Sequence, residues 1–156
     1  MLTVITGPPC SGKTTYLRQH RMPGDITIDF DDLAQTLGSP VHHGHSDDIR
    51  RVTIAARSAA IRAAIEAHQR GTRVWIVDMA PSQTRLDQYK RAGARMVKLS
   101  ADREILHARA DAERPPNWHN LIDQWLDSGG QPVLPPWHTK PGRDGGDPEP
   151  RTATHW

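Results

Sequence analysis

A glycine-rich segment near the start of the chain constrains the fold more than any other feature. Eight residues match the pattern G-x-x-x-x-G-K-[ST] at every specified position: Gly7, Pro8, Pro9, Cys10, Ser11, Gly12, Lys13 and Thr14. The segment follows a short apolar run at 2–6 and precedes a stretch at 14–19 with helical character. In this strand–loop–helix context the pattern predicts a phosphate-binding loop, or P-loop, rather than an ordinary glycine-rich turn.

Each specified position of the pattern has a physical reason. The glycines let the backbone curl so that successive amides face phosphate oxygens, and the helix N-terminus adds positive potential. We expect Lys13 to reach the β- and γ-phosphates of a nucleotide and Thr14 to hold magnesium. Together with the neighbouring Thr15, the segment predicts a binding site for a nucleoside triphosphate, namely ATP with Mg²⁺.

Stretches of strand and helix character alternate along the first 127 residues. The sequence predicts strands at 25–28, 74–77 and 96–99, a long helix at 47–70, a helix capped by Ser82, another capped by Ser100 and a last one at 118–126. Such alternation predicts an α/β fold in which helices flank a parallel sheet and ligands bind at the carboxyl ends of its strands. With the phosphate-binding pattern, the prediction becomes a three-layer P-loop NTPase fold of the small-kinase type.

Composition sets the domain boundary and the expected location. Residues 1–127 are predicted to form one P-loop kinase domain, and the proline- and glycine-rich residues 128–156 a tail or linker. The formal charge of +2 permits an anionic partner without requiring one.

No apolar run approaches the roughly 20 residues that span a bilayer, and the N-terminus lacks the pattern of a secretory signal. The single cysteine cannot form an internal disulfide, so we expect a cytoplasmic protein without a membrane partner.

Aspartates follow two of the predicted strands. Asp29, Asp31 and Asp32 come after the second strand, and Asp78 ends the apolar strand at 74–77. A kinase needs a carboxylate that orients or takes the proton of the acceptor hydroxyl. The first three residues can instead cap a helix start, and Asp78 can be a magnesium or water ligand, so the residues themselves leave these roles open.

The chain resembles the kinase domain of phage-type polynucleotide kinases over about residues 1–127. The resemblance rests on the P-loop, the segment at 28–33, the strand that ends at Asp78 and the arginines of 106–114. It implies that Asp31 activates the 5′-hydroxyl of a nucleic acid and that Asp78 helps to organise the acceptor. It also implies that Arg109 and Arg114 are lid residues that contact the donor phosphates beside the catalytic Lys13.

The sequence departs from this family at one acceptor position. The family commonly has an arginine three residues after the catalytic aspartate, where it grips the acceptor phosphate, but this chain has Ala34. Arg50 and Arg57 on the long predicted helix are candidates to replace it, and a hydroxymethylated base in DNA is an alternative acceptor. Two other functions stay open: a kinase for a nucleoside, sugar or antibiotic, and a regulatory protein that hydrolyses ATP slowly.

Three histidines and three tryptophans indicate a function less specifically than the P-loop and the aspartates do. His42, His43 and His45 lie in a predicted loop without regularly spaced further ligands, so we expect a mobile loop at the acceptor mouth rather than a zinc site. The tryptophans at 75, 118 and 125 lie on a buried strand and an amphipathic helix, which favours core packing over base stacking.

Overall fold

The computed structural model describes residues 1–113 and 118–130. Within these residues, strands and helices alternate in the order β1 (Leu2–Thr6), α1 (Lys13–His20), β2 (Ile26–Ile28), α2 (Phe30–Thr36), α3 (Asp47–Gln69), β3 (Val74–Val77), α4 (Gln83–Arg91), β4 (Arg95–Lys98), α5 (Arg103–Glu113) and α6 (Trp118–Asp127). The predicted tail falls almost entirely outside them.

The four strands form one parallel sheet in the order β2-β3-β1-β4. Leu2 of β1 lies opposite Val74 of β3, and Val74 also pairs with Ile26 of β2. Because the two central strands carry almost only buried residues, they match the continuous apolar runs of parallel strands covered on both faces. The predicted α/β fold with a parallel sheet flanked by helices is therefore confirmed.

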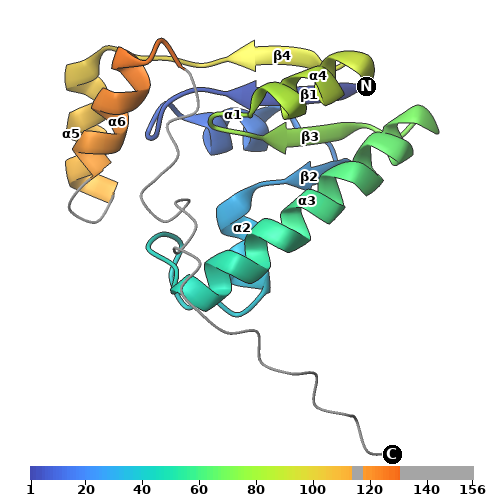
Figure 1. Ribbon diagram of the computed structural model, residues 1–156, viewed down its shortest axis with the longest axis horizontal. Helices are drawn as coiled ribbons and strands as arrows, with labels where there is room; N and C mark the ends of the chain where they lie inside the picture. Colours follow the sequence, from blue (N-terminus) through green and yellow to red (C-terminus); the bar gives the residue numbers. More distant parts are fainter. Residues whose placement is uncertain (114–117, 131–156) are drawn as a thin grey trace, which may run out of the picture.

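Helices cover the sheet from both sides (Figure 1). On one face, Ile61 and Ile65 of α3 and Tyr89 of α4 pack against side chains of the three strands β1, β2 and β3. On the other face, Leu17 of α1 packs with Ile5 of β1 and with side chains of β3. This helix–sheet–helix arrangement is compatible with three layers, and it leaves the carboxyl edge of the sheet for loops.

The helices α5 and α6 lie side by side beyond the carboxyl ends of the strands (Figure 1). Leu106 and Ala110 of α5 and Ile122 of α6 form a small core with Cys10 of the loop that follows β1. The indole Nε1 of Trp125 donates a hydrogen bond of 3.3 Å to the carbonyl of Met79, just after β3. The pair is thus anchored to the edge of the sheet where a ligand is expected.

The predicted helix starts were right in one case and wrong in another. Ser82 caps α4, because its hydroxyl accepts the backbone N–H of Arg85. Ser100 does not cap α5, which begins only at Arg103. The chain stays hydrogen-bonded to the sheet up to Leu99, whose amide donates to Thr6 O at 2.8 Å, and residues 100–102 then connect the sheet to the helix.

The tryptophan prediction is confirmed for two residues. Trp75 and Trp125 are buried, while Trp118 is half-buried and packs against the small core beside Cys10. Among the described residues, no helix combines the length and the apolar character that crossing a membrane requires.

Candidate functional site

The loop between β1 and α1 has a tightly curled backbone. Gly7, Cys10 and Gly12 all have positive φ angles, of 142°, 60° and 85°. A β-carbon on Gly7 would lie 2.1 Å from the carbonyl oxygen of Leu99, so only glycine fits there. The curl therefore follows from the glycines of the sequence pattern and from the close approach of the strand end at Leu99.

Lys13 bends back over this loop. Its ammonium group donates to the carbonyl oxygen of Gly7 at 2.9 Å and also to that of Pro8. A third contact, of 3.4 Å, joins it to the hydroxyl of Ser11. The lysine charge is thus held at the mouth of the curled loop, close to the backbone that precedes α1, whereas Thr15 is exposed on the first turn of that helix.

A hydrogen bond joins the loop to the end of the second strand. The hydroxyl of Thr14 donates to Oδ2 of Asp29 at 2.8 Å. The other oxygen of Asp29 accepts the backbone N–H of Asp31 at 3.0 Å and so caps α2. Asp29 therefore sits at the junction of the two segments that the sequence predicted to carry the chemistry.

Burial perturbs Asp29. It is 6% exposed, and the loss of water raises the pKa of its carboxyl above the ordinary value. The Thr14 hydroxyl opposes the rise by stabilising the charged form, while the nearby charges of Asp31 and Asp32 add to it. A hydroxyl and a carboxylate side by side form the kind of oxygen pair that Mg²⁺ binds, and a cation there would offset the cost of the buried charge.

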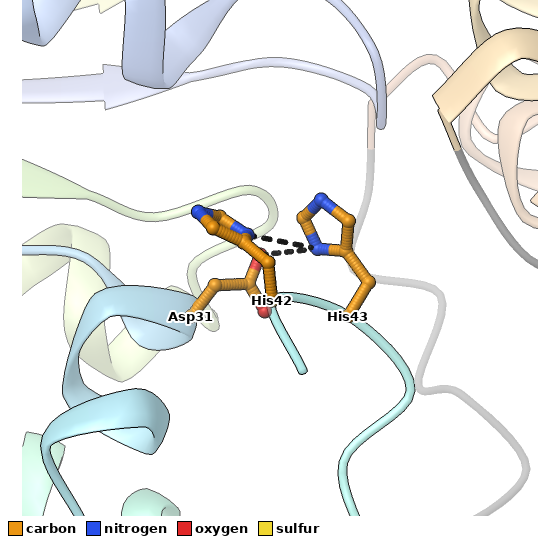
Figure 2. A group of neighbouring side chains, drawn as sticks. All are labelled: Asp31, His42 and His43. Atoms are coloured by element: carbon orange, nitrogen blue, oxygen red, sulfur yellow. Dashed lines mark hydrogen bonds and ion pairs between the residues drawn. The ribbon is translucent and has the colours of Figure 1, made fainter. Parts of the chain in front are cut away.

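Asp31 is held by two histidines. Its Oδ1 lies 2.9 Å from Nε2 of His45, and its Oδ2 lies 3.0 Å from Nδ1 of His43. His45 is buried, and its Nδ1 lies 2.7 Å from the hydroxyl of Ser39. Because an ionised carboxylate only accepts hydrogen bonds, Nε2 of His45 carries a proton whenever Asp31 is charged. The loop that the sequence placed at the acceptor mouth is therefore tied to Asp31 (Figure 2).

The neighbouring Asp32 points to different partners. It lies 3.7 Å from Arg18 of α1 and 3.8 Å from His42, and its side chain is 47% exposed. The two adjacent aspartates thus have distinct surroundings, and Asp31 is the one that is held from both sides. Ala34, on the next turn, is fully buried, so this position of α2 faces the protein interior and an acceptor-binding arginine would not fit there.

A second carboxylate lies where the third strand ends. Asp78 is 7% exposed, and its Oδ2 accepts a hydrogen bond of 2.8 Å from the hydroxyl of Tyr89. Its Oδ1 is 3.3 Å from Nη2 of Arg57, which also donates to Val77 O at 2.7 Å. Burial and the charge of Asp78 raise the pKa of Tyr89, so the phenol stays protonated. The structure thus brings together Asp78 and Arg57, both of which the sequence assigned to the acceptor.

The other predicted arginines differ in what they contact. Arg109 of α5 donates to Cys10 O in the curled loop at 3.1 Å, and its predicted role as a lid residue stays a prediction. Arg50 of α3 donates to Asp47 at 3.0 Å and to His45 O at 2.8 Å, so it supports the histidine loop. Arg114 lies outside the described residues.

Four contacts that build the site were absent from the sequence-based assignments. The contact of Asp29 with Thr14 could have been predicted from the sequence, because Asp29 directly follows the second strand. The sequence placed the histidine loop at the acceptor mouth but gave no signal for the contacts of His43 and His45 with Asp31. It gave none for Tyr89 either, which meets Asp78 only through the packing of α4.

Comparison of the sequence with models of known protein families finds no match, and comparison with curated proteins finds none either. The interpretation of the site therefore depends on its own chemistry. It combines a curled loop with a lysine, a hydroxyl–carboxylate pair at Thr14 and Asp29, and a second carboxylate at Asp31 on the adjoining helix turn. Such a set can bind an anionic group beside a divalent cation and orient a hydroxyl next to it.

Proposed function

We propose that this chain is an ATP-dependent kinase of the P-loop NTPase fold that transfers the γ-phosphoryl group to a hydroxyl acceptor. The observation that carries the proposal is the hydrogen bond between Thr14 and Asp29. It joins the predicted phosphate loop to the aspartates after β2, so that donor and acceptor chemistry share one edge of the sheet. The cytoplasm, which supplies ATP, is the location that fits this activity.

The donor side would work through three groups. The curled backbone presents amides to the phosphates of ATP, and Lys13 places a positive charge where the β- and γ-phosphates would lie. Thr14 and Asp29 would supply oxygen ligands for Mg²⁺, which when bound would neutralise charge on the transferring group. Arg109, already in contact with the loop, is placed to add a further positive charge from α5.

The acceptor side would work through Asp31. Its carboxylate orients the acceptor hydroxyl and takes its proton as the hydroxyl oxygen bonds to phosphorus and ADP leaves. The histidine at 45 fixes the direction of this carboxylate from the buried side. By the resemblance to phage-type polynucleotide kinases, the acceptor we propose first is the 5′-hydroxyl end of a polynucleotide, or a hydroxymethyl base in DNA.

One observation favours a second candidate, a kinase for a small hydroxyl compound. Arg50 and Arg57 are the cations expected to bind the phosphate of a nucleic-acid substrate, but both have hydrogen-bond or ion-pair partners within the protein. Arg50 contacts Asp47 and His45 O, and Arg57 contacts Asp78 and Val77 O. A nucleoside, sugar or antibiotic without a phosphate group would not need them. The same donor site serves both candidates.

The test is a phosphoryl-transfer assay with γ-labelled ATP and Mg²⁺. The acceptors are 5′-hydroxyl DNA, 5′-hydroxyl RNA, hydroxymethyl-pyrimidine DNA and free nucleosides, and the Lys13→Ala variant is the control for contaminating kinases. Label on an oligonucleotide end supports the first candidate, and label only on a small compound supports the second. Phosphate release without any labelled acceptor would contradict the kinase proposal and favour a slow regulatory ATPase.

A further inference from the structure

Three side-chain atoms from two segments converge beside α2. They belong to Asp31, His42 and His43, and one possible ligand atom of each lies within 4.8 Å of those of the other two (Figure 2). The Nδ1 of His43 is 3.0 Å from the Asp31 oxygen and 3.4 Å from Nδ1 of His42. Two imidazoles and one carboxylate therefore bring possible metal-ligating atoms close together.

The spacing of these atoms suits a bound metal ion. Ligand atoms that are each about 2.1 Å from Zn²⁺ lie about 3.0–3.4 Å apart for bond angles between a right angle and the tetrahedral angle. The distances of 3.0 and 3.4 Å that join Nδ1 of His43 to Asp31 and to His42 fall in this interval. A cation placed between the atoms would replace the direct contacts that Nδ1 of His43 makes with the other two residues.

The ligand types select the class of metal. Imidazole nitrogens suit Zn²⁺, Ni²⁺ and Cu²⁺, whereas Mg²⁺ prefers oxygen ligands in octahedral geometry. Two histidines and one carboxylate also leave coordination positions open for water, as in catalytic zinc sites. This cluster would therefore select transition metals, whereas the oxygen pair of Thr14 and Asp29 would select Mg²⁺. The two sites are adjacent, because the backbone N–H of Asp31 donates to Asp29.

Two further features support the carboxylate as a ligand. Its other oxygen, Oδ1, is held at 2.9 Å by Nε2 of His45, whose Nδ1 contacts the hydroxyl of Ser39 at 2.7 Å. Such outer hydrogen bonds orient metal ligands and strengthen binding. The side chains of His43, Asp31 and His42 are 17%, 25% and 38% exposed, which gives an ion a path from solvent.

We propose that Asp31, His42 and His43 form a binding site for a divalent transition metal of the Zn²⁺ class. Resting on the proposed function, the site also has a regulatory consequence: a metal on Oδ2 occupies the carboxylate that would orient the acceptor hydroxyl. Zn²⁺ then inhibits phosphoryl transfer without displacing ATP and Mg²⁺. The loop of residues 38–46 would thus couple the availability of a transition metal to the activity of the kinase.

The binding test is titration calorimetry of Zn²⁺ into the whole chain in the presence of excess Mg²⁺. The expected result is one Zn²⁺ per chain in the parent protein. The His42→Gln/His43→Gln double variant should bind at least about 100-fold more weakly, because the loss of an outer partner alone costs 10–100-fold. The matched control is His20→Gln/His68→Gln, which removes two imidazoles elsewhere and should leave the affinity unchanged.

Several results would overturn the metal site. They are the absence of Zn²⁺ binding in the parent, equal binding by the His42/His43 variant, or an equal loss in the control. A second measurement, the visible absorption of Co²⁺ bound in place of Zn²⁺, should show coordination by the parent and its loss in the His42/His43 variant. Circular dichroism spectra like those of the parent show that the variants are folded.

The regulatory consequence is tested separately, so that its failure and that of the proposed function can be told apart. Zn²⁺ should lower transfer by the parent, with recovery on chelation, and should have at least about 100-fold weaker effect on the His42/His43 variant. If Zn²⁺ binds at these residues but no acceptor is phosphorylated, the kinase proposal fails and the metal site stands. If transfer occurs and Zn²⁺ bound at the cluster does not inhibit it, the regulatory consequence is wrong.

Discussion

The donor and acceptor sides of the candidate site are built in different ways. On the donor side, residues 7–14 follow one another in the sequence, and their geometry depends on local backbone angles such as those of Gly7 and Gly12. On the acceptor side, Asp31 meets His43 and His45 of the loop before α3, and Asp78 meets Arg57 and Tyr89 from two other helices. A contiguous loop can be recognised as a pattern, whereas a site assembled from distant segments cannot.

This difference also separates the expected consequences of mutation. A change in the donor loop removes a group that acts on phosphate directly and should affect every acceptor equally. A change on the acceptor side should alter transfer while nucleotide binding stays the same. Variants on each side, compared under the same conditions, therefore test whether the two sides are as distinct as the structure indicates.

The largest effect is expected for Asp31→Asn, which should lower phosphoryl transfer by about 10²–10⁴, the usual contribution of a positioned general base. Asparagine keeps the shape of the side chain but cannot take a proton. Asp32→Asn is the matched control, because Asp32 is 47% exposed and only loosely paired with Arg18. The measurement is the single-turnover rate, with ATP affinity from calorimetry. A dead Asp32→Asn beside an active Asp31→Asn would mean that the roles of the two aspartates are reversed.

Lys13→Ala should lower transfer by about 10²–10³, as the loss of one stabilising group for a developing negative charge does. The physical reason is that the lysine ammonium lies in the curled loop, where the β- and γ-phosphates are expected. Lys90→Ala, on the exposed face of α4, removes the same charge elsewhere and should leave the rate unchanged. Activity of Lys13→Ala within about threefold of the parent would rule out the phosphate-loop assignment.

Asp29→Asn should lower Mg²⁺-dependent transfer by about 10–100-fold, the equivalent of one charge-assisted interaction of about 1.5–3 kcal/mol. Without Mg²⁺ the same variant should be more stable than the parent. Burial raises the pKa of Asp29 in the folded protein, so folding favours its protonated form, and stability falls as pH rises from the unfolded pKa through the folded one. At pH 7 the ionised carboxylate is a cost that asparagine removes, while asparagine still caps α2.

Thermal unfolding in a chelator measures this gain. We expect a higher melting temperature for Asp29→Asn than for the parent at pH 7. The gain should shrink as pH falls toward the ordinary range of an aspartate. A lower melting temperature for Asp29→Asn at pH 7 would contradict this expectation. It would show that the ionised carboxylate of Asp29 stabilises the fold more than its burial destabilises it.

Tyr89→Phe should have the smallest effect on transfer. It removes the hydroxyl that donates to Asp78 at 2.8 Å, but Arg57 still contacts the other oxygen. Leaving a buried acceptor with one partner fewer should reduce the free energy of unfolding by about 1–3 kcal/mol, measured by urea denaturation. Loss of transfer as large as that of Asp31→Asn would mean that Asp78 takes part in the chemistry more directly than its surroundings indicate.

The sequence by itself determined the elements whose signals are local. The apolar strand runs, the long helix closed by Gly71 and the curled loop of residues 7–14 all follow from side-chain periodicity and from glycine at positions with positive φ. The parallel sheet followed from their alternation. The start of α5 was missed because residues 100–102 connect the sheet to the helix before α5 begins at Arg103, which the capping pattern at Ser100 does not reveal.

Only the tertiary structure decided which side chains meet. Thr14 bonds Asp29 because the helix after β1 and the end of β2 lie at the same edge of the sheet. His43 and His45 reach Asp31 because the chain turns back between α2 and α3 before α3 packs on the sheet. Such contacts depend on loop closure and packing over many residues, which leave no periodic trace in the sequence. The sequence therefore pointed to Asp31, and the fold supplied its partners.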